Sequence, residues 1–251
     1  MAGSEVGGEP AADDIPLYLR LLWRGEDGDR PGPKRGVDLR TIGAAGVRIA
    51  DADGIANVTM RKLAADLGFT TMALYRYVTS KTELLTLVVD TGYADLPAID
   101  ATADWRQQIS EWAHANKQVL LAHPWILQVP ISEPPLTPNQ ISWMERGLAA
   151  LAGTGLREQE KLSSMLLVDV YVRGQTQLTV GVGIQAEPTE DDLRYARRLR
   201  ALADPKDFPW INAALASGAL EDDDQDFVID EFTFGLETVL DGIAARMMRR
   251  S

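Results

Sequence analysis

Residues 59–77 read TMRKLAADLGFTTMALYRY, and this stretch decides the fold. Its first half places Leu63, Ala64 and Leu67 on one face of a predicted helix. Gly68 then supplies the backbone freedom for a turn, and Leu74 returns to the same core. Two short helices joined by such a turn are typical of a helix-turn-helix that reads the major groove of DNA. The spacing alone leaves a plain three-helix packing unit open as the alternative.

The flanking residues carry further helix signals. Residues 38–53 repeat apolar side chains at helical spacing and stop at a glycine. Thr59 is a predicted N-cap, and Thr70 or Thr71 caps the next helix, expected to run through Tyr77. A capping box at residues 80–83 opens a helix that is expected to end near residue 95.

The charge is distributed unevenly along the chain. The net charge of −12 by itself argues against a nucleic-acid partner. Residues 30–81, however, hold nine Lys or Arg against four Asp, whereas the residues on both sides are acidic. This basic island surrounds the helix-turn-helix pattern and favours the DNA-reading interpretation.

Three motifs carry a resemblance to a known family: VTMRKLAADLG at 58–68, LYRYV at 74–78 and SKTELL at 80–85. The stretch 37–85 resembles the DNA-binding domain of the TetR family of bacterial one-component transcription regulators. Residues 98–251 resemble, less sharply, the tetracycline-repressor type of C-terminal domain. The resemblance implies a homodimer that binds a double-stranded DNA operator and a small-molecule effector.

The same resemblance implies roles for individual residues. Thr71, Met72 and Ala73 occupy base-reading positions, and Arg61 reaches a base edge or a phosphate. The remaining DNA-binding residues of the helix-turn-helix surround these and contact phosphates: Thr59, Thr70, Tyr75, Tyr77 and Lys81. Met72 and Ala73 offer only apolar contacts, so the operator sequence does not follow from these residues.

The first 36 residues form a predicted extension. Residues 15–23 are expected to be a short helix docked on its own domain rather than a membrane-surface anchor, because acidic residues flank it. Lys34 and Arg35 belong to a basic arm, RPGPKRG, that either enters the minor groove of DNA or serves as a solubilising linker. Both interpretations of the arm stay open.

The fold class follows as all-α: an N-terminal three-helix helix-turn-helix domain plus a helical C-terminal effector-binding and dimerisation domain. The predicted domains are 1–36, 37–84 and 85–251. Helices beyond the first domain are expected at 105–122, 125–129, 138–151, 156–180, 189–202, 209–216 and 226–250. No apolar run is long enough to span a membrane and no signal peptide is present, so a cytoplasmic location is expected.

Aromatic and Met side chains in the second domain suggest an apolar effector pocket. The effector is expected to be largely apolar and aromatic or polycyclic. Ordinary core packing is the alternative for most of these residues, and a salt bridge within the dimer is the alternative for the charged ones. The candidate ligand-binding residues are His123, Trp125, Met144, Met165, Asp169, Tyr171 and Arg173.

The last predicted helix offers a candidate dimer interface. Phe232 and Val239 lie on its apolar stripe, and Gly235 and Gly242 lie seven residues apart on a neighbouring line. Glycine costs helix propensity, which makes sense where another helix approaches closely. Packing within the chain is the alternative.

Other functional classes lack support in the sequence. There is no cysteine, and only two histidines are present, so no metal site or cofactor is expected. No nucleophile with its base, phosphate loop or paired carboxylates can be identified, so an enzyme is not expected. An architectural DNA-binding protein without an effector is the remaining alternative to a ligand-responsive repressor.

Overall fold

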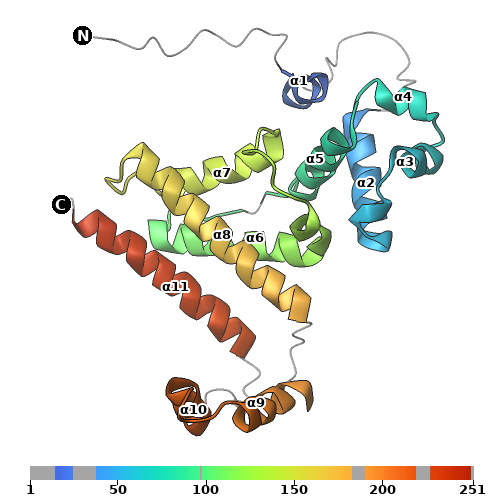
Figure 1. Cartoon of the computed structure of the whole chain (residues 1–251). Helices are drawn as coiled ribbons and strands as arrows, with labels where there is room; N and C mark the ends of the chain where they lie inside the picture. The colour runs from blue at the N-terminus through green and yellow to red at the C-terminus, as the bar shows by residue number, and fades with distance from the viewer. Residues whose placement is uncertain (1–14, 25–37, 97, 183–189, 219–226, 250–251) are drawn as a thin grey trace, which may run out of the picture. The chain divides into compact units, whose positions relative to one another are not determined.

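The computed structural model describes residues 15–24, 38–96, 98–182, 190–218 and 227–249. Over these residues the chain forms eleven α-helices and two short 3-10 helices and no strand, which confirms the all-α prediction (Figure 1). The chain divides into two compact units, Met1–Gly153 and Thr154–Ser251. The domain boundary predicted at residues 84 and 85 lies within the first unit and stays a prediction.

Helix α1 (Leu17–Arg24) docks within the first unit. Tyr18 and Leu19 are each 5% exposed, and the Trp23 indole donates a hydrogen bond to the carbonyl of Leu136 at 2.8 Å. The structure therefore confirms that the apolar segment before the basic arm is a helix held on its own unit. Lys34 and Arg35 lie outside the described residues.

Helices α2 (Leu39–Asp53) and α5 (Lys81–Gly92) pack closely against each other. Two glycines of α2 permit this approach. A Cβ on Gly46 would lie 2.3 Å from Val88, and a Cβ on Gly43 would lie 2.1 Å from the Thr91 hydroxyl. The two helices form the frame on which the helix-turn-helix rests.

The short 3-10 helix η2 (Ile55–Asn57) leads into helices α3 (Met60–Leu67) and α4 (Thr71–Tyr75), which form the predicted helix-turn-helix. Helix α4 ends at Tyr75 rather than Tyr77, because the backbone turns there and buries Val78 completely. Helix α5 ends at Gly92 rather than near residue 95. There the Tyr93 carbonyl leaves the helical pattern and accepts a hydrogen bond from the Trp143 indole at 2.9 Å.

The rest of the first unit is α6 (Trp105–Ala122), η3 (Pro124–Gln128) and α7 (Pro138–Ala150). Tyr93, Trp112 and Trp143 form its aromatic core, with edge-to-face ring pairs at 5.7 and 5.9 Å. The Trp112 indole donates to the carbonyl of Trp143 at 2.9 Å. Both indole N–H groups are thus satisfied by backbone carbonyls, as buried tryptophans require.

The second unit contains α8 (Glu158–Val182), α9 (Glu190–Leu202), α10 (Pro209–Ala216) and α11 (Phe227–Met248). Helices α8 and α11 pack on each other. Helix α8 begins two residues later than predicted, because the backbone N–H of Arg157 donates to the Glu160 carboxylate at 3.0 Å and this bond caps the helix start. Met165, Val168 and Val172 of α8 are buried.

Candidate nucleic-acid interface and effector region

The turn between α3 and α4 is held by local hydrogen bonds. Thr59 caps α3 by accepting from the Lys62 backbone N–H at 3.2 Å, and Thr70 caps α4 by accepting from Ala73 at 3.3 Å. Gly68 adopts the left-handed conformation (φ 70°) that ends α3. Leu63 and Leu74 are fully buried and lock both helices to one core. The predicted caps and turn are confirmed, as are the core positions of Leu63 and Leu74, whereas Leu67 is only partly buried.

The residues predicted to read bases lie, together with Tyr75, on the outer side of α4. Met72 is 73% exposed and Tyr75 is 47% exposed, whereas Thr71 and Ala73 are partly exposed. Because Leu74 anchors the opposite side of this helix, these four side chains form one surface. An exposed methionine has no packing role in the chain, which fits apolar contact with a thymine methyl group.

The predicted phosphate contacts surround this surface. Thr59, Arg61 and Lys81 are exposed, and Tyr77 is partly exposed. Lys81 is the first residue of α5, where backbone N–H groups also favour a phosphate. Ser80 caps α5 through the Glu83 backbone N–H at 3.1 Å, while the Glu83 carboxylate accepts from Thr79 rather than from Ser80 itself.

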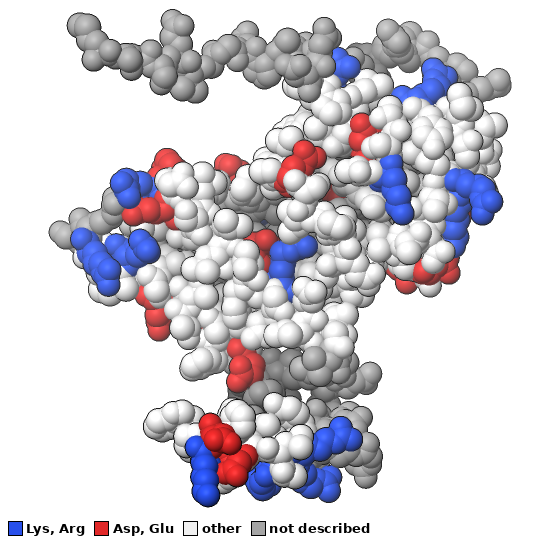
Figure 2. Space-filling model, viewed as in Figure 1, with Lys and Arg blue, Asp and Glu red and all other residues white. Residues whose placement is uncertain are grey.

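The basic island separates into scaffold and candidate contact residues. Arg48 pairs with Asp66 at 2.7 Å, and Lys62 pairs with Asp53, so both cations tie α2 to α3. Arg40, Arg61, Arg76 and Lys81 are exposed. None of these four forms an ion pair with another described residue. Figure 2 shows Lys and Arg side chains standing out over the helix-turn-helix region.

Arg76 was not predicted as a contact residue. It directly follows α4 and is exposed beside Tyr75. Its place inside the LYRYV motif, between two predicted phosphate contacts, was the signal that could have identified it.

His123 and Trp125, expected in an effector pocket, contact the DNA-binding region. The Trp125 indole donates to the Asp51 carboxylate at 2.6 Å, and the His123 Nδ1 lies 2.8 Å from the same oxygen. Asp51 is near the end of α2, and Trp125 is 2% exposed. We call these three residues the Asp51 clamp. The clamp fastens η3 to α2, the helix that supports the helix-turn-helix.

A second connection joins α5 to α7. The Asp90 carboxylate, 1% exposed, accepts from the backbone N–H groups of Asn139 and Gln140 at 3.0 and 3.2 Å. It thereby caps the start of a helix to which it does not belong. Burial raises the pKa of Asp90, and hydrogen bonds from Thr137, Gln140 and Asn139 offset part of that rise. This residue was not predicted.

The other candidate effector residues occupy different positions. Met144 is partly exposed on α7, and Met165 is buried on α8. Asp169 and Arg173 are partly exposed. The Tyr171 hydroxyl donates to the carbonyl of Phe232 at 2.8 Å, and burial raises its pKa. Because these residues are divided between the two units, a single pocket that includes them all stays a prediction.

The candidate dimer residues of α11 fall into two groups. Phe232 is 2% exposed and packs its ring against Tyr171 at 5.7 Å, and a Cβ on Gly235 would lie 2.3 Å from the Tyr171 hydroxyl. This pair therefore packs within the chain, and a dimer role for these two residues stays a prediction. Val239 is partly exposed, and Gly242 is exposed with open space beside it. Both can still meet a partner.

Helix α8 offers an apolar surface whose residues were not among the predicted dimer residues. Several large apolar side chains on one side of the helix are exposed: Leu162, Leu166, Leu167, Val170 and Leu178. Phe234 of α11 is also 72% exposed. The run MLLVDVYV at 165–172, apolar nearly all round, was the signal, because the chain itself buries only one side of this helix.

Two absences apply to the described part of the chain. No helix there is long and apolar enough to cross a membrane. No group of three or more His, Cys, Asp or Glu side chains there is arranged to hold a metal ion.

Comparisons with known proteins cover both units. The family described as "Bacterial regulatory proteins, tetR family" matches residues 42–88, and "Tetracyclin repressor-like, C-terminal domain" matches residues 96–247. The HTH-type transcriptional repressor DrrR1 of Streptomyces coeruleorubidus is 35% identical over 94% of this chain and 88% of its own.

Solved structures agree with these matches. The Streptomyces coelicolor TetR family protein ActR in complex with actinorhodin is 25% identical, with a TM-score of 0.67 over 83% of this chain and 96% of its own. BioQ with its natural double-stranded DNA operator is 24% identical, with a TM-score of 0.55 over 83% of this chain and 99% of its own.

Proposed function

The chain belongs to the tetR family of bacterial regulatory proteins, and on this premise we propose that it is a homodimeric repressor released from a palindromic operator by a small, largely apolar effector. The family is one of transcriptional regulators, and the relative DrrR1 is named a transcriptional repressor. A cytoplasmic location, where operator DNA is accessible, is part of the proposal.

The observation that carries DNA binding is the outer side of α4. Met72 and Tyr75 are large side chains that are exposed rather than packed in the core, while Leu74 between them is completely buried. Exposed cations flank this surface, although the whole chain is strongly acidic. A short capped helix with this division of side chains suits insertion into a major groove, with phosphates held at its edges.

Dimerisation is supported by the apolar side of α8. A row of exposed leucine and valine side chains is unfavourable in water, and a second copy of the same helix would bury it. Gly242 on α11 adds a place where a partner helix can approach. A twofold dimer places two α4 helices on one face of DNA, about 34–36 Å apart, which requires a palindromic site.

The effector is proposed to act through the Asp51 clamp and Asp90. The clamp fixes α2 to η3, and Asp90 fixes α5 to α7, so α6, η3 and α7 are tied to the frame of the helix-turn-helix. An effector that favours another arrangement of these helices would change the separation of the two α4 helices. Reversing operator occupancy from 99:1 to 1:99 requires a preference of about 5.5 kcal/mol.

The class of effector is supported by composition and by a relative. Five of the six tryptophans lie after residue 98, and the related ActR was solved with actinorhodin. An aromatic or polycyclic effector fits both observations.

Selection of binding sites from random duplex DNA tests the core of this proposal. We expect enrichment of a near-palindromic sequence, bound with a slope of log affinity against log salt that reflects several phosphate contacts. Aromatic polycyclic compounds added to that complex should lower the operator affinity. DNA binding that no compound changes would favour the architectural alternative, and failure to enrich any sequence would refute the proposal.

A further inference from the structure

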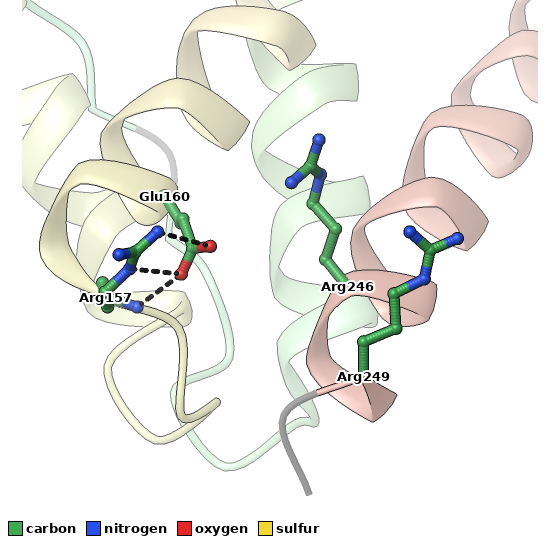
Figure 3. A pocket seen from close by; sticks show the side chains of 4 residues that line it. All are labelled: Arg157, Glu160, Arg246 and Arg249. Atoms are coloured by element: carbon green, nitrogen blue, oxygen red, sulfur yellow. Dashed lines mark hydrogen bonds and ion pairs between the residues drawn. The ribbon is translucent and has the colours of Figure 1, made fainter.

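The second unit contains a hollow between the start of α8 and the end of α11. Its volume is about 430 Å³, and it is lined by Arg157, Glu160, Arg246 and Arg249. Figure 3 shows Arg157 and Glu160 at the start of α8 and Arg246 and Arg249 at the end of α11. All four side chains are charged, so this hollow differs from an apolar effector pocket.

Three cations and one anion give the hollow a net charge of +2, in a chain whose net charge is −12. The Glu160 carboxylate lies 3.3 Å from the Arg157 Nη2, and the same carboxylate caps α8. Neither Arg246 nor Arg249 forms an ion pair with any residue that the structure describes. The single carboxylate therefore leaves two guanidinium groups uncompensated.

The helix dipole accounts for part of this arrangement. Cations in the last turn of a helix are favourable, and Arg246 and Arg249 lie at the end of α11. The dipole of α11 does not account for the third guanidinium, that of Arg157 just before α8. Like charges around one hollow repel each other. A bound anion would offset this repulsion.

Guanidinium groups recognise oxyanions through paired N–H donors. We propose that this hollow binds a small oxyanion with two or more negative charges, held by Arg246 and Arg249 and faced by Arg157. Phosphate and short dicarboxylates share this chemistry. The proposal concerns a second site, and it does not depend on operator binding or on the apolar effector.

Titration calorimetry of the full-length protein tests the proposal, with inorganic phosphate and malonate as separate probes at constant ionic strength. The Arg246→Gln and Arg249→Gln variants should each weaken binding about tenfold, or about 1.4 kcal/mol. Glu160→Gln keeps an acceptor for capping α8 and removes the carboxylate charge, so it should tighten binding. Arg198→Gln, an exposed arginine on α9, is the matched control and should leave binding unchanged.

Opposite changes in Arg246→Gln and Glu160→Gln would support the site, and a response to one probe would identify the class of oxyanion. Thermal unfolding without the probe checks that each variant folds. Binding that is absent in the wild type at about 10 mM probe, or that is equal in all variants, would overturn the proposal.

Discussion

Replacing Asp90 with alanine tests how α5 is fixed to α7. The substitution removes the acceptor for the backbone N–H groups of Asn139 and Gln140 at the start of α7. Each N–H left unsatisfied costs about 1–3 kcal/mol, so the loss is about 2–6 kcal/mol. The substitution also removes a buried carboxylate whose pKa is raised, and this recovers part of the lost stability. We therefore expect a net destabilisation of about 2–4 kcal/mol.

Asp104→Ala is the matched control. Asp104 is exposed and caps its own helix, α6, through the Gln107 backbone N–H at 2.9 Å. Losing such a cap costs about 1 kcal/mol. Urea unfolding followed by tryptophan fluorescence suits the comparison, because five of the six tryptophans lie in residues 1–153. Equal losses in the two variants, with equal denaturant slopes, would refute the cross-helix cap.

The pH dependence provides an independent check on Asp90. Its pKa is raised in the folded state, so folding disfavours the ionised form. Below the unfolded pKa of about 4 the group is protonated in both states and exerts no penalty. As pH rises from there through the folded pKa, the wild type should lose stability relative to Asp90→Asn. A stability difference between them that does not change with pH would contradict the raised pKa.

Four further perturbations test the interfaces. Lys81→Ala should weaken binding to all DNA sequences alike and reduce the salt slope by about 0.9, as measured by anisotropy titration. Leu166→Glu places a charge on the exposed side of α8, so sedimentation should show monomers with unchanged helix content. Gly46→Ala collides with Val88 and should destabilise the chain by more than 1 kcal/mol in urea. Alanine at both Lys34 and Arg35 should weaken binding to A·T-rich sites if the arm enters the minor groove. Deleting residues 1–36 is a poorer test, because it also removes α1.

The features that were predictable from sequence depend on nearby residues. Thr59, Thr70, Ser80 and Gly68 act on backbone groups within three or four positions, so their roles are visible in the order of residues. Apolar spacing likewise located the helices, because it reports which side of a helix is buried. Helix ends were less predictable. Helix α5, for example, ends where the indole of a tryptophan from another helix donates a hydrogen bond to a backbone carbonyl.

The unpredicted features depend on residues far apart in the chain. Asp90 meets its partners 49 and 50 positions away, and Asp51 meets His123 and Trp125 at 72 and 74 positions. An isolated aspartate has no periodicity, and a buried one differs from an exposed one only in the folded chain. The same limit applies to Phe232. Its apolar spacing predicts a buried side chain, but it does not tell packing within the chain from packing against a second subunit.

The Asp51 clamp gives a reason why His123 and Trp125 need not belong to a pocket wall to matter for regulation. Both are donors to one carboxylate oxygen, and that carboxylate lies on the helix that frames the DNA-reading surface. In the proposed mechanism, an effector has only to favour a position of η3 in which these two bonds are broken. Release of α2 and effector binding would then share one free-energy change. Asp51→Asn should therefore weaken the coupling between them, whereas Asp95→Asn, at an exposed aspartate after α5, should not. Effector-dependent operator release that is equal in the two variants would exclude the clamp as the connection.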